Sequence, residues 1–320
     1  TSCPSVPTAP MGTDMTLRNA VAALLLIVTA VPAQAQLRVF ACEPEWAALV
    51  RALVPDAELT TATSHLQDPH YIEARPSLIA AVRRADIAVC TGASLEAGWL
   101  PMLLQRASNP DIQAGRPGLF FAADHAQLHA PHDHVDRSMG DVHPEGNPHV
   151  HLSPDQLPEI ARALANRLGE IEPERAVAIQ GRYIRWRGDW NGLRAEWRAR
   201  AEALRGQSVV VQHSNFGYLL RWLGVETAAD LEPKPGLPPS ASHLSQLLAN
   251  PELEDANAIL IASYQDPQPG EWLAEQTGLP VVVVPGTVTG EAPADTLGGL
   301  ISEIIRQVES AAAGASHDGV

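Results

Sequence analysis

The chain has 320 residues, 45% of them hydrophobic, so it is long enough for two domains with sizeable cores. Its formal net charge of −15 at pH 7 argues against nucleic acid and anionic membrane surfaces as partners, because both are negatively charged. The same charge suits a cationic ligand, although acidic soluble proteins are common.

The N-terminal region carries the features of a secretory signal peptide. Residues 15–18 are short and basic, residues 20–31 are apolar, and Ala33-Gln34-Ala35 is an A-x-A cleavage signal. The apolar run is too short for a transmembrane helix. We expect residues 1–35 to be the signal peptide with its preceding residues, and the mature chain to begin near Gln36. No cysteine follows the cleavage signal, which argues against a lipid anchor, so a Gram-negative bacterium would export the chain to the periplasm.

Strand-like and helix-like runs alternate along the rest of the chain. The strand-like runs are apolar without alternation, as in parallel strands covered on both faces; they span residues 38–41, 87–91, 208–212, 258–262 and 281–284. Helix-like runs span residues 44–53, 76–84, 154–168 and 294–310. This order predicts an α/β fold with parallel sheets.

Cys42 and Cys90 each lie at the end of a strand-like run, whereas Cys3 lies in the segment that we expect to be removed. Neighbouring parallel strands would bring Cys42 and Cys90 together, and an exported protein meets an oxidising compartment. We favour a disulfide between them; two separate buried thiols are the alternative. Their spacing lacks the CxxC pattern of a thiolate zinc site.

Residues 173–205 differ from their surroundings because they are rich in Arg, Ala, Glu and Trp. One apolar stripe recurs at helical spacing: Trp186, Trp190, Leu193, Trp197, Ala201 and Leu204. At 1.5 Å per residue a continuous helix here would span roughly 45 Å, enough to connect two domains. We expect an N-terminal lobe over 36–172, this linker helix, a C-terminal lobe over 206–310 and a disordered tail over 311–320; two shorter helices around Gly188 are the alternative.

Seven of the twelve histidines lie between His125 and His151, and imidazole is the commonest protein ligand for zinc at neutral pH. Residues 124–147 are rich in His, Asp, Gly and Pro and lack apolar periodicity, which predicts a mobile loop. Its histidines are candidates for a second, weaker metal site: His125, His129, His132, His134 and His143. A solvated loop without metal is the alternative.

Three histidines stand where ligands of open α/β sheets bind, beyond the carboxyl ends of strands. His213 directly follows a buried strand-like run, and His70 precedes a helix. His149 precedes Ser153, which we expect to cap a helix that begins at Pro154. In an extended run, His149 and His151 would face opposite ways, so only one of them would enter a site.

These residues and their neighbours resemble the zinc- and manganese-binding proteins of ABC importers, the ZnuA-like cluster, and within it the AztC-like zinc proteins. The motifs that carry the resemblance are His70 ahead of Arg75-Pro76-Ser77; N-P-H-V-H-L-S-P at 147–154, with His151 in place of an aromatic residue; H-S-N-F-G-Y at 213–218; and G-A-S-L-E-A-G-W-L at 92–100, one residue longer than the usual pattern. They occur in the family's order over residues 37–310.

The resemblance implies two α/β lobes joined by a long rigid helix, with a metal site in the cleft between the lobes and His70, His149 and His213 as ligands. The family's fourth ligand is a carboxylate just after the final strand, but this chain has Pro285-Gly286-Thr287 there. We predict Asp266 as the substitute, since it too follows a strand-like run. Asp295, Glu291 or a water molecule are the alternatives.

Three imidazoles and one carboxylate favour Zn²⁺ over manganese, and a closed tetrahedron leaves no open position for catalysis. The resemblance therefore implies a monomeric, non-enzymatic protein that captures periplasmic zinc and delivers it to an ABC transporter permease, with a periplasmic zinc donor as a further partner. A secreted zinc hydrolase is the first alternative, although no HExxH motif is present. A zinc buffer or adhesin without a transporter is the second.

Overall fold

The computed structural model describes residues 1–5, 8, 36–131, 140 and 142–315. The chain divides into two units, residues 1–36 and 37–320, and the fold described below is that of the second unit. The expected signal peptide lies almost entirely outside the described residues. Among those residues, no helix combines the length and the apolar character that a membrane span requires.

The first lobe is built on a parallel sheet of four strands in the order β2-β1-β3-β4. The strands are β1 (Arg38–Ala41), β2 (Glu58–Thr61), β3 (Ile87–Cys90) and β4 (Leu119–Phe121). The helices of this lobe are α2 (Pro44–Leu53), α3 (Pro76–Arg84), α4 (Leu100–Ala107) and α5 (Leu157–Ile171), with short 3-10 helices at Ala122–His125 and Val150–Leu152. The sequence thus forms the expected parallel α/β lobe.

The second lobe repeats this plan with a parallel sheet in the order β6-β5-β7-β8. Its strands are β5 (Ser208–Val211), β6 (Glu226–Asp230), β7 (Ala256–Ala262) and β8 (Val281–Val284). Its helices are α7 (Gly217–Leu223), α8 (Ala241–Leu247), α9 (Gln268–Thr277) and α10 (Leu297–Ala315), with 3-10 helices at Ser214–Phe216 and Pro251–Asp255. The helix α10 therefore continues past residue 310, where we expected the tail to begin.

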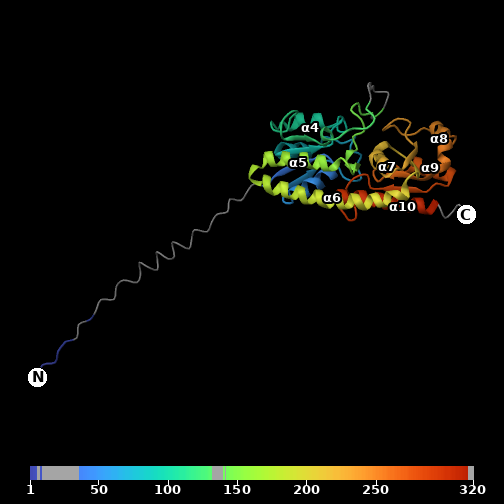
Figure 1. The fold of residues 1–320 in the computed structure, drawn as a ribbon. Coiled ribbons are helices and arrows are strands. Elements are labelled where there is room, and N and C mark those ends of the chain that lie inside the picture. Colours follow the sequence, from blue (N-terminus) through green and yellow to red (C-terminus); the bar gives the residue numbers. More distant parts are fainter. Residues whose placement is uncertain (6–7, 9–35, 132–139, 141, 316–320) are drawn as a thin grey trace. The chain divides into compact units, whose positions relative to one another are not determined.

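One long helix, α6 (Ala176–Leu204), joins the lobes and follows a 3-10 turn at Pro173–Arg175. It is continuous over 29 residues, so the alternative of two helices broken at Gly188 is excluded. The helix packs against α5 of the first lobe and α10 of the second. Figure 1 shows α6 running along both lobes with α10 beside it.

The apolar stripe of α6 lies in a core that the two lobes share. Trp190 and Trp197 are fully buried, and their rings meet edge to face with centroids 5.2 Å apart. The same cluster of buried side chains includes Leu164 of α5 and Ile304 of α10. Because apolar burial favours this arrangement by roughly 25 cal/mol per Å², the shared core holds the lobes together along the helix.

Two local expectations around His149 are wrong. Residues Val150–Leu152 form a 3-10 turn and not an extended run. The helix α5 begins at Leu157, and the Ser153 side chain does not cap it; the Ser153 carbonyl instead accepts hydrogen bonds from the amides of Gln156 and Leu157. Residues 153–156 thus form a turn ahead of the helix. Pro158, and not Pro154, stands in the first turn of α5, where a missing amide hydrogen costs nothing.

Candidate metal centre

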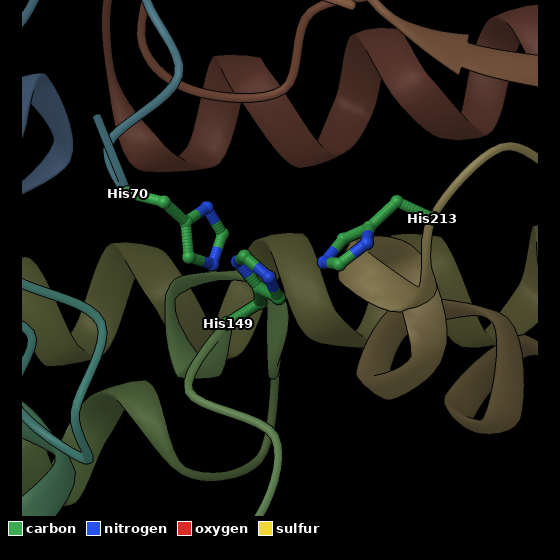
Figure 2. A group of neighbouring side chains, drawn as sticks. All are labelled: His70, His149 and His213. Atoms are coloured by element: carbon green, nitrogen blue, oxygen red, sulfur yellow. The ribbon is translucent and has the colours of Figure 1, made fainter. Parts of the chain in front are cut away.

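Three imidazoles from three separate segments converge between the lobes. His70 lies in the loop between β2 and α3, His149 lies just before the 3-10 turn ahead of α5, and His213 is the second residue after β5. One ring nitrogen from each lies within 4.8 Å of the others. Figure 2 shows the three rings pointing toward a common centre. The structure therefore brings together three of the four residues that the sequence nominated as ligands.

Burial makes this group of imidazoles energetically unfavourable unless a cation is bound. His149 is 2% exposed and His213 is 5% exposed, and Nε2 of His149 has no hydrogen-bond partner within the described residues. A buried polar atom left without a partner costs about 1–3 kcal/mol. An unsatisfied imidazole nitrogen facing two other imidazoles is the arrangement that a divalent metal would complete.

Two carboxylates orient the rings from behind. Asp68 Oδ1 lies 2.7 Å from Nδ1 of His70, and Glu232 Oε2 lies 2.8 Å from Nδ1 of His213. Since each carboxylate engages Nδ1, the Nε2 nitrogen of each ring is left for the centre. Carboxylate–histidine pairs of this kind fix the tautomer and raise the basicity of metal ligands.

Sequence reasoning missed both carboxylates. Asp68 stands two residues before His70 and also accepts the backbone N–H of His70, a local turn that the Asp-Pro-His order indicates. Glu232 follows β6, and its position beside His213 becomes visible only when β6 is known to pair with β5. No run of apolar residues marks β6, which is why this neighbour was not foreseen.

The pKa values of His149 and His213 shift in opposite directions. Burial lowers the pKa of His149 well below its usual range, and the imidazoles of His213 and His70 lower it further. For His213, burial alone would lower the pKa, but the hydrogen bond and negative charge of Glu232 outweigh it and raise the pKa above the ordinary value. His149 is therefore a neutral donor at pH 7, whereas His213 holds its proton more tightly.

A fourth imidazole, His143 of the His-rich segment, lies beside His70. Its Nε2 lies 3.2 Å from Nε2 of His70, and the two ring centroids are 5.3 Å apart. Burial and then the charge of His70 lower the pKa of His143 to about 3, so its ring is neutral at pH 7. Among the histidines assigned to a separate loop site, His143 is thus placed beside the primary group.

Asp266 lies apart from this group. Its side chain is exposed, and its carboxylate accepts the backbone N–H of Gln268 at 3.1 Å in the turn before α9. The two alternative carboxylates, Glu291 and Asp295, are exposed as well. Asp266 as the fourth ligand therefore stays a prediction, and its position in this structure does not support it.

The other predicted residues have their own environments. His125 stacks on Phe120 with ring centroids 4.9 Å apart, and His129 stacks on Tyr218 at 4.3 Å. His132 and His134 lie outside the described residues. His151 turns away from the three imidazoles and contacts the second lobe, so of the two motif histidines only His149 enters the group.

Cys42 and Cys90 are joined by a disulfide, with Cα atoms 4.8 Å apart, at the ends of β1 and β3. Glu96 lies close to both sulfur atoms, so these three residues form a second group with metal-ligand spacing. Sulfur atoms in a disulfide offer no thiolate, so this group binds no metal in the oxidised protein.

Comparisons with known proteins bear on the family and the fold of the chain. A family model described as ZnuA, zinc-uptake complex component A, periplasmic, matches residues 39–311. A curated relative, the high-affinity zinc uptake system protein ZnuA of Yersinia pestis, is 25% identical over 191 residues. That alignment covers 56% of this chain and 60% of the relative, so the chain spans less than two thirds of the relative's length.

Solved structures share the fold over nearly their whole length. The periplasmic zinc-binding protein TroA from Treponema pallidum has a TM-score of 0.73 with this chain at 18% identity, and the match covers 87% of this chain and 99% of TroA. A crystal structure of ZnuA gives 0.72 at 19% identity, with 87% and 99% covered. A manganese-bound periplasmic metal-binding protein from Candidatus Liberibacter asiaticus gives 0.70 at 16% identity, with 87% and 100% covered.

Proposed function

Because the chain belongs to the ZnuA family of periplasmic zinc-uptake components, we propose that it captures Zn²⁺ in the periplasm and delivers it to the permease of an ABC transporter. The observation that carries this proposal is the convergence of His70, His149 and His213 between the lobes. A zinc site with four protein ligands leaves no position for a catalytic water molecule, which argues against a hydrolase.

We propose Nε2 of His70, His149 and His213 as three of the zinc ligands. Asp68 and Glu232 engage the opposite nitrogen of two of these rings, which leaves Nε2 free to bind metal. Nitrogen donors favour zinc over manganese, which prefers oxygen ligands, although a relative of similar fold is manganese-bound.

For the fourth ligand we propose His143. Zinc–nitrogen bonds of about 2.0–2.1 Å in a tetrahedron separate neighbouring donors by roughly 3.3 Å. The observed 3.2 Å between Nε2 of His143 and Nε2 of His70 matches one such edge. His143 lies outside the group of three rings whose nitrogens are within 4.8 Å of one another, so its ring would have to move toward His149 and His213 on zinc binding. Asp266, predicted from the sequence, is the competing candidate, and the alanine variants of these two residues separate the alternatives.

The test is metal analysis of the purified protein followed by chelator-competition titration. We expect one tightly bound zinc per chain, and each of His70→Ala, His149→Ala and His213→Ala should lower the affinity by more than the roughly 10- to 100-fold that loss of an outer partner costs. His243→Ala, a half-buried histidine of α8 outside the group, is the matched control. Full affinity in His213→Ala would refute the site.

The fourth ligand is decided in the same titration. We expect His143→Ala to weaken zinc binding and Asp266→Ala to leave it unchanged; the reverse result would restore Asp266. The transport role is tested by deleting the gene under zinc limitation and restoring it as the parent or as His213→Ala. A zinc buffer without a transporter would give no growth defect.

A further inference from the structure

The segment that carries His149 is attached to the second lobe at both ends. On one side, Asn147 Nδ2 donates to the carbonyl of Ser214 at 2.8 Å, next to the proposed ligand of the second lobe. The hydroxyl of Tyr218 donates to the Asn147 carbonyl, also at 2.8 Å. His149 belongs to the first lobe by chain order, but its position is thus tied to the second.

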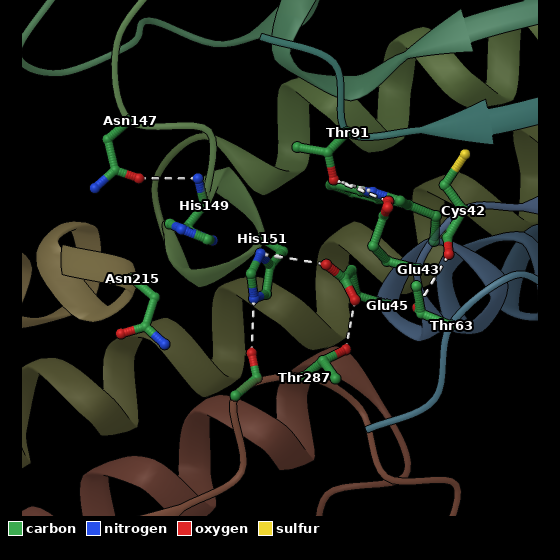
Figure 3. Close-up of polar contacts among 12 residues, drawn as sticks. Cys42, Glu43, Glu45, Thr63, Thr91, Asn147, His149, His151, Asn215 and Thr287 are labelled. Atoms are coloured by element: carbon green, nitrogen blue, oxygen red, sulfur yellow. Dashed lines mark hydrogen bonds and ion pairs between the residues drawn. The ribbon is translucent and has the colours of Figure 1, made fainter. Parts of the chain in front are cut away.

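On the other side of His149, a buried polar cluster holds His151. Its Nε2 donates to the carbonyl of Gly286 at 3.0 Å, across the boundary between the lobes. Its Nδ1 lies 3.3 Å from Oε1 of Glu45, a contact that is an ion pair only when the ring carries both protons. The other oxygen of Glu45 accepts a hydrogen bond from the hydroxyl of Thr287. Figure 3 shows Glu45 in contact with both His151 and Thr287.

All three side chains of this cluster are removed from water, since Glu45 is 2% exposed, His151 5% and Thr287 7%. Buried polar groups gain specific geometry only when their partners are in place, and loss of one partner leaves the others unsatisfied. Glu45 comes from α2 of the first lobe, whereas Thr287 follows β8 of the second. The cluster therefore couples the two lobes directly beside His149.

The turn that receives His151 is itself fixed in the second lobe. A Cβ atom on Gly286 would lie 2.5 Å from the ring of Tyr264 and 3.0 Å from Cβ of Ala262, so only glycine lets the chain pass this close. The hydroxyl of Tyr264 in turn accepts a hydrogen bond from Nδ2 of Asn215 at 3.2 Å. The position of Gly286 is thus set by the same β7 end and loop that flank His213.

We propose that Glu45, His151 and Thr287 are positioning residues that hold His149 in register with His213 across the two lobes. This inference rests on the proposed function, because it assigns these residues a role in presenting a zinc ligand. They do not touch the metal; they fix the backbone on the C-terminal side of His149, as Asn147 fixes it on the other side.

The physical reason is preorganisation. In the described part of the chain, Nε2 of His149 is buried without a hydrogen-bond partner, so a loosely held segment would move to find one and would no longer point this nitrogen at the centre. A site binds tightly only when its ligands are held close to the productive geometry by their supports. Fixing the segment on both sides keeps the unsatisfied nitrogen pointed at the metal.

The test uses Thr287→Val, which removes the hydroxyl and keeps the shape, and Thr287→Ser, which keeps the hydroxyl. Thr63→Val is the matched control, because Thr63 is equally buried at 7% and its hydroxyl donates to the carbonyl of Cys42 within the first lobe. We expect Thr287→Val to lose about 10-fold or more in zinc affinity and to alter the ligand-field spectrum of bound cobalt. Thr287→Ser should restore both, and Thr63→Val should change neither.

Glu45→Gln provides a second, independent variant, since it removes the charge facing His151 while keeping an acceptor for Thr287. If residues 45 and 287 act as one unit, the affinity of the double variant falls by less than the product of the single losses. Parent-like zinc affinity and cobalt spectrum in Thr287→Val and Glu45→Gln would overturn the proposal, whatever their stability. Failure of the parent itself to bind zinc, or of His213→Ala to weaken binding, would instead overturn the proposed function.

Discussion

At the scale of single residues, the centre is defined as much by what holds the imidazoles as by the imidazoles themselves. Glu232 is the clearest case, because it engages Nδ1 of His213 and also accepts the backbone N–H of Gly236 at 2.7 Å. Such a partner sets the orientation of the ring and the basicity of the nitrogen that faces the metal.

We expect Glu232→Gln to lower zinc affinity by roughly 10- to 100-fold while the protein stays folded. The amide keeps the size of the side chain but loses the charge that makes His213 a better donor. Chelator competition measures the change, and Glu226→Gln serves as the control, because Glu226 is an exposed residue at the start of β6. An unchanged affinity would mean that the Glu232 charge does not support the ligand.

Zinc affinity should also decrease as the pH is lowered, chiefly because His213 becomes protonated. Glu232 raises the pKa of this imidazole above the ordinary value, so a proton competes with zinc at a higher pH than it would for a free histidine. Affinity is therefore full above this raised pKa and is lost as the pH falls through it. His149 adds little to this loss, because its pKa lies well below the usual range.

The same titration on Glu232→Gln checks the sign. Without the carboxylate, burial lowers the pKa of His213, so the loss of affinity should move to lower pH. Dissociation constants measured between about pH 5 and pH 8 cover the range in which histidine titrates. A profile that moves to higher pH, or does not move, would contradict this assignment.

Sequence reasoning identified the proposed ligands more easily than the residues that support them. His213 and His149 could be found because each stands beside a strong local signal, a buried strand or a proline-flanked turn. His143 was visible as a histidine but not as a neighbour of His70, since 73 residues separate them and no periodic pattern links them. Contacts across the lobes depend on the packing of whole elements, which local patterns do not encode.

At the scale of elements, the strands that the sequence missed are β2, β4 and β6, and all three lie at sheet edges. The central strands β1, β3, β5 and β7 are covered on both faces and read as apolar runs. Edge strands are partly solvated; β2 and β6 contain mixed residues, and β4 is only three residues long. The signal of β2 and β6 is weak because they are partly exposed, and that of β4 because it is short. The edge strand β8 was predicted although it is only partly buried, because it is a run of four valines.

The helix α6 illustrates a different point, since three glycines within it do not break it. Gly188 is exposed, and a Cβ atom there would meet nothing within 4 Å. We expect Gly188→Ala to stabilise the metal-free protein by about 1 kcal/mol, because alanine loses less backbone entropy on folding. Urea unfolding followed by far-UV circular dichroism measures the change.

A second helix supplies the contrasting variant. In α10, a Cβ atom on Gly299 would lie 2.0 Å from the carbonyl oxygen of Pro293, a clash with backbone that cannot easily yield. Gly299→Ala should therefore destabilise the protein in the same assay, despite the identical chemical change. Equal effects of the two substitutions would show that helix propensity alone, and not space, decides the outcome.

At the scale of the whole molecule, α6 and the shared core limit how far the lobes can move. Trp197 is fully buried against the rest of the core, and its Nε1 donates to Ser302 Oγ of α10 at 2.9 Å. Hinge opening would expose this side chain and Trp190, at a cost of roughly 2 kcal/mol or more for each. A bound metal could drive such a motion only by binding the two lobe arrangements with different affinities.

We therefore expect zinc to leave the separation of the lobes unchanged and to act on the loops around the centre. Small-angle scattering of chelator-treated and zinc-loaded protein should give the same radius of gyration within error. Hydrogen exchange should slow in the segments that carry His70, His143 and His149, but not in α6. His213→Ala, which should bind zinc poorly, is the control for both measurements. A marked compaction on zinc binding would show that the shared core yields, and that α6 acts as a hinge.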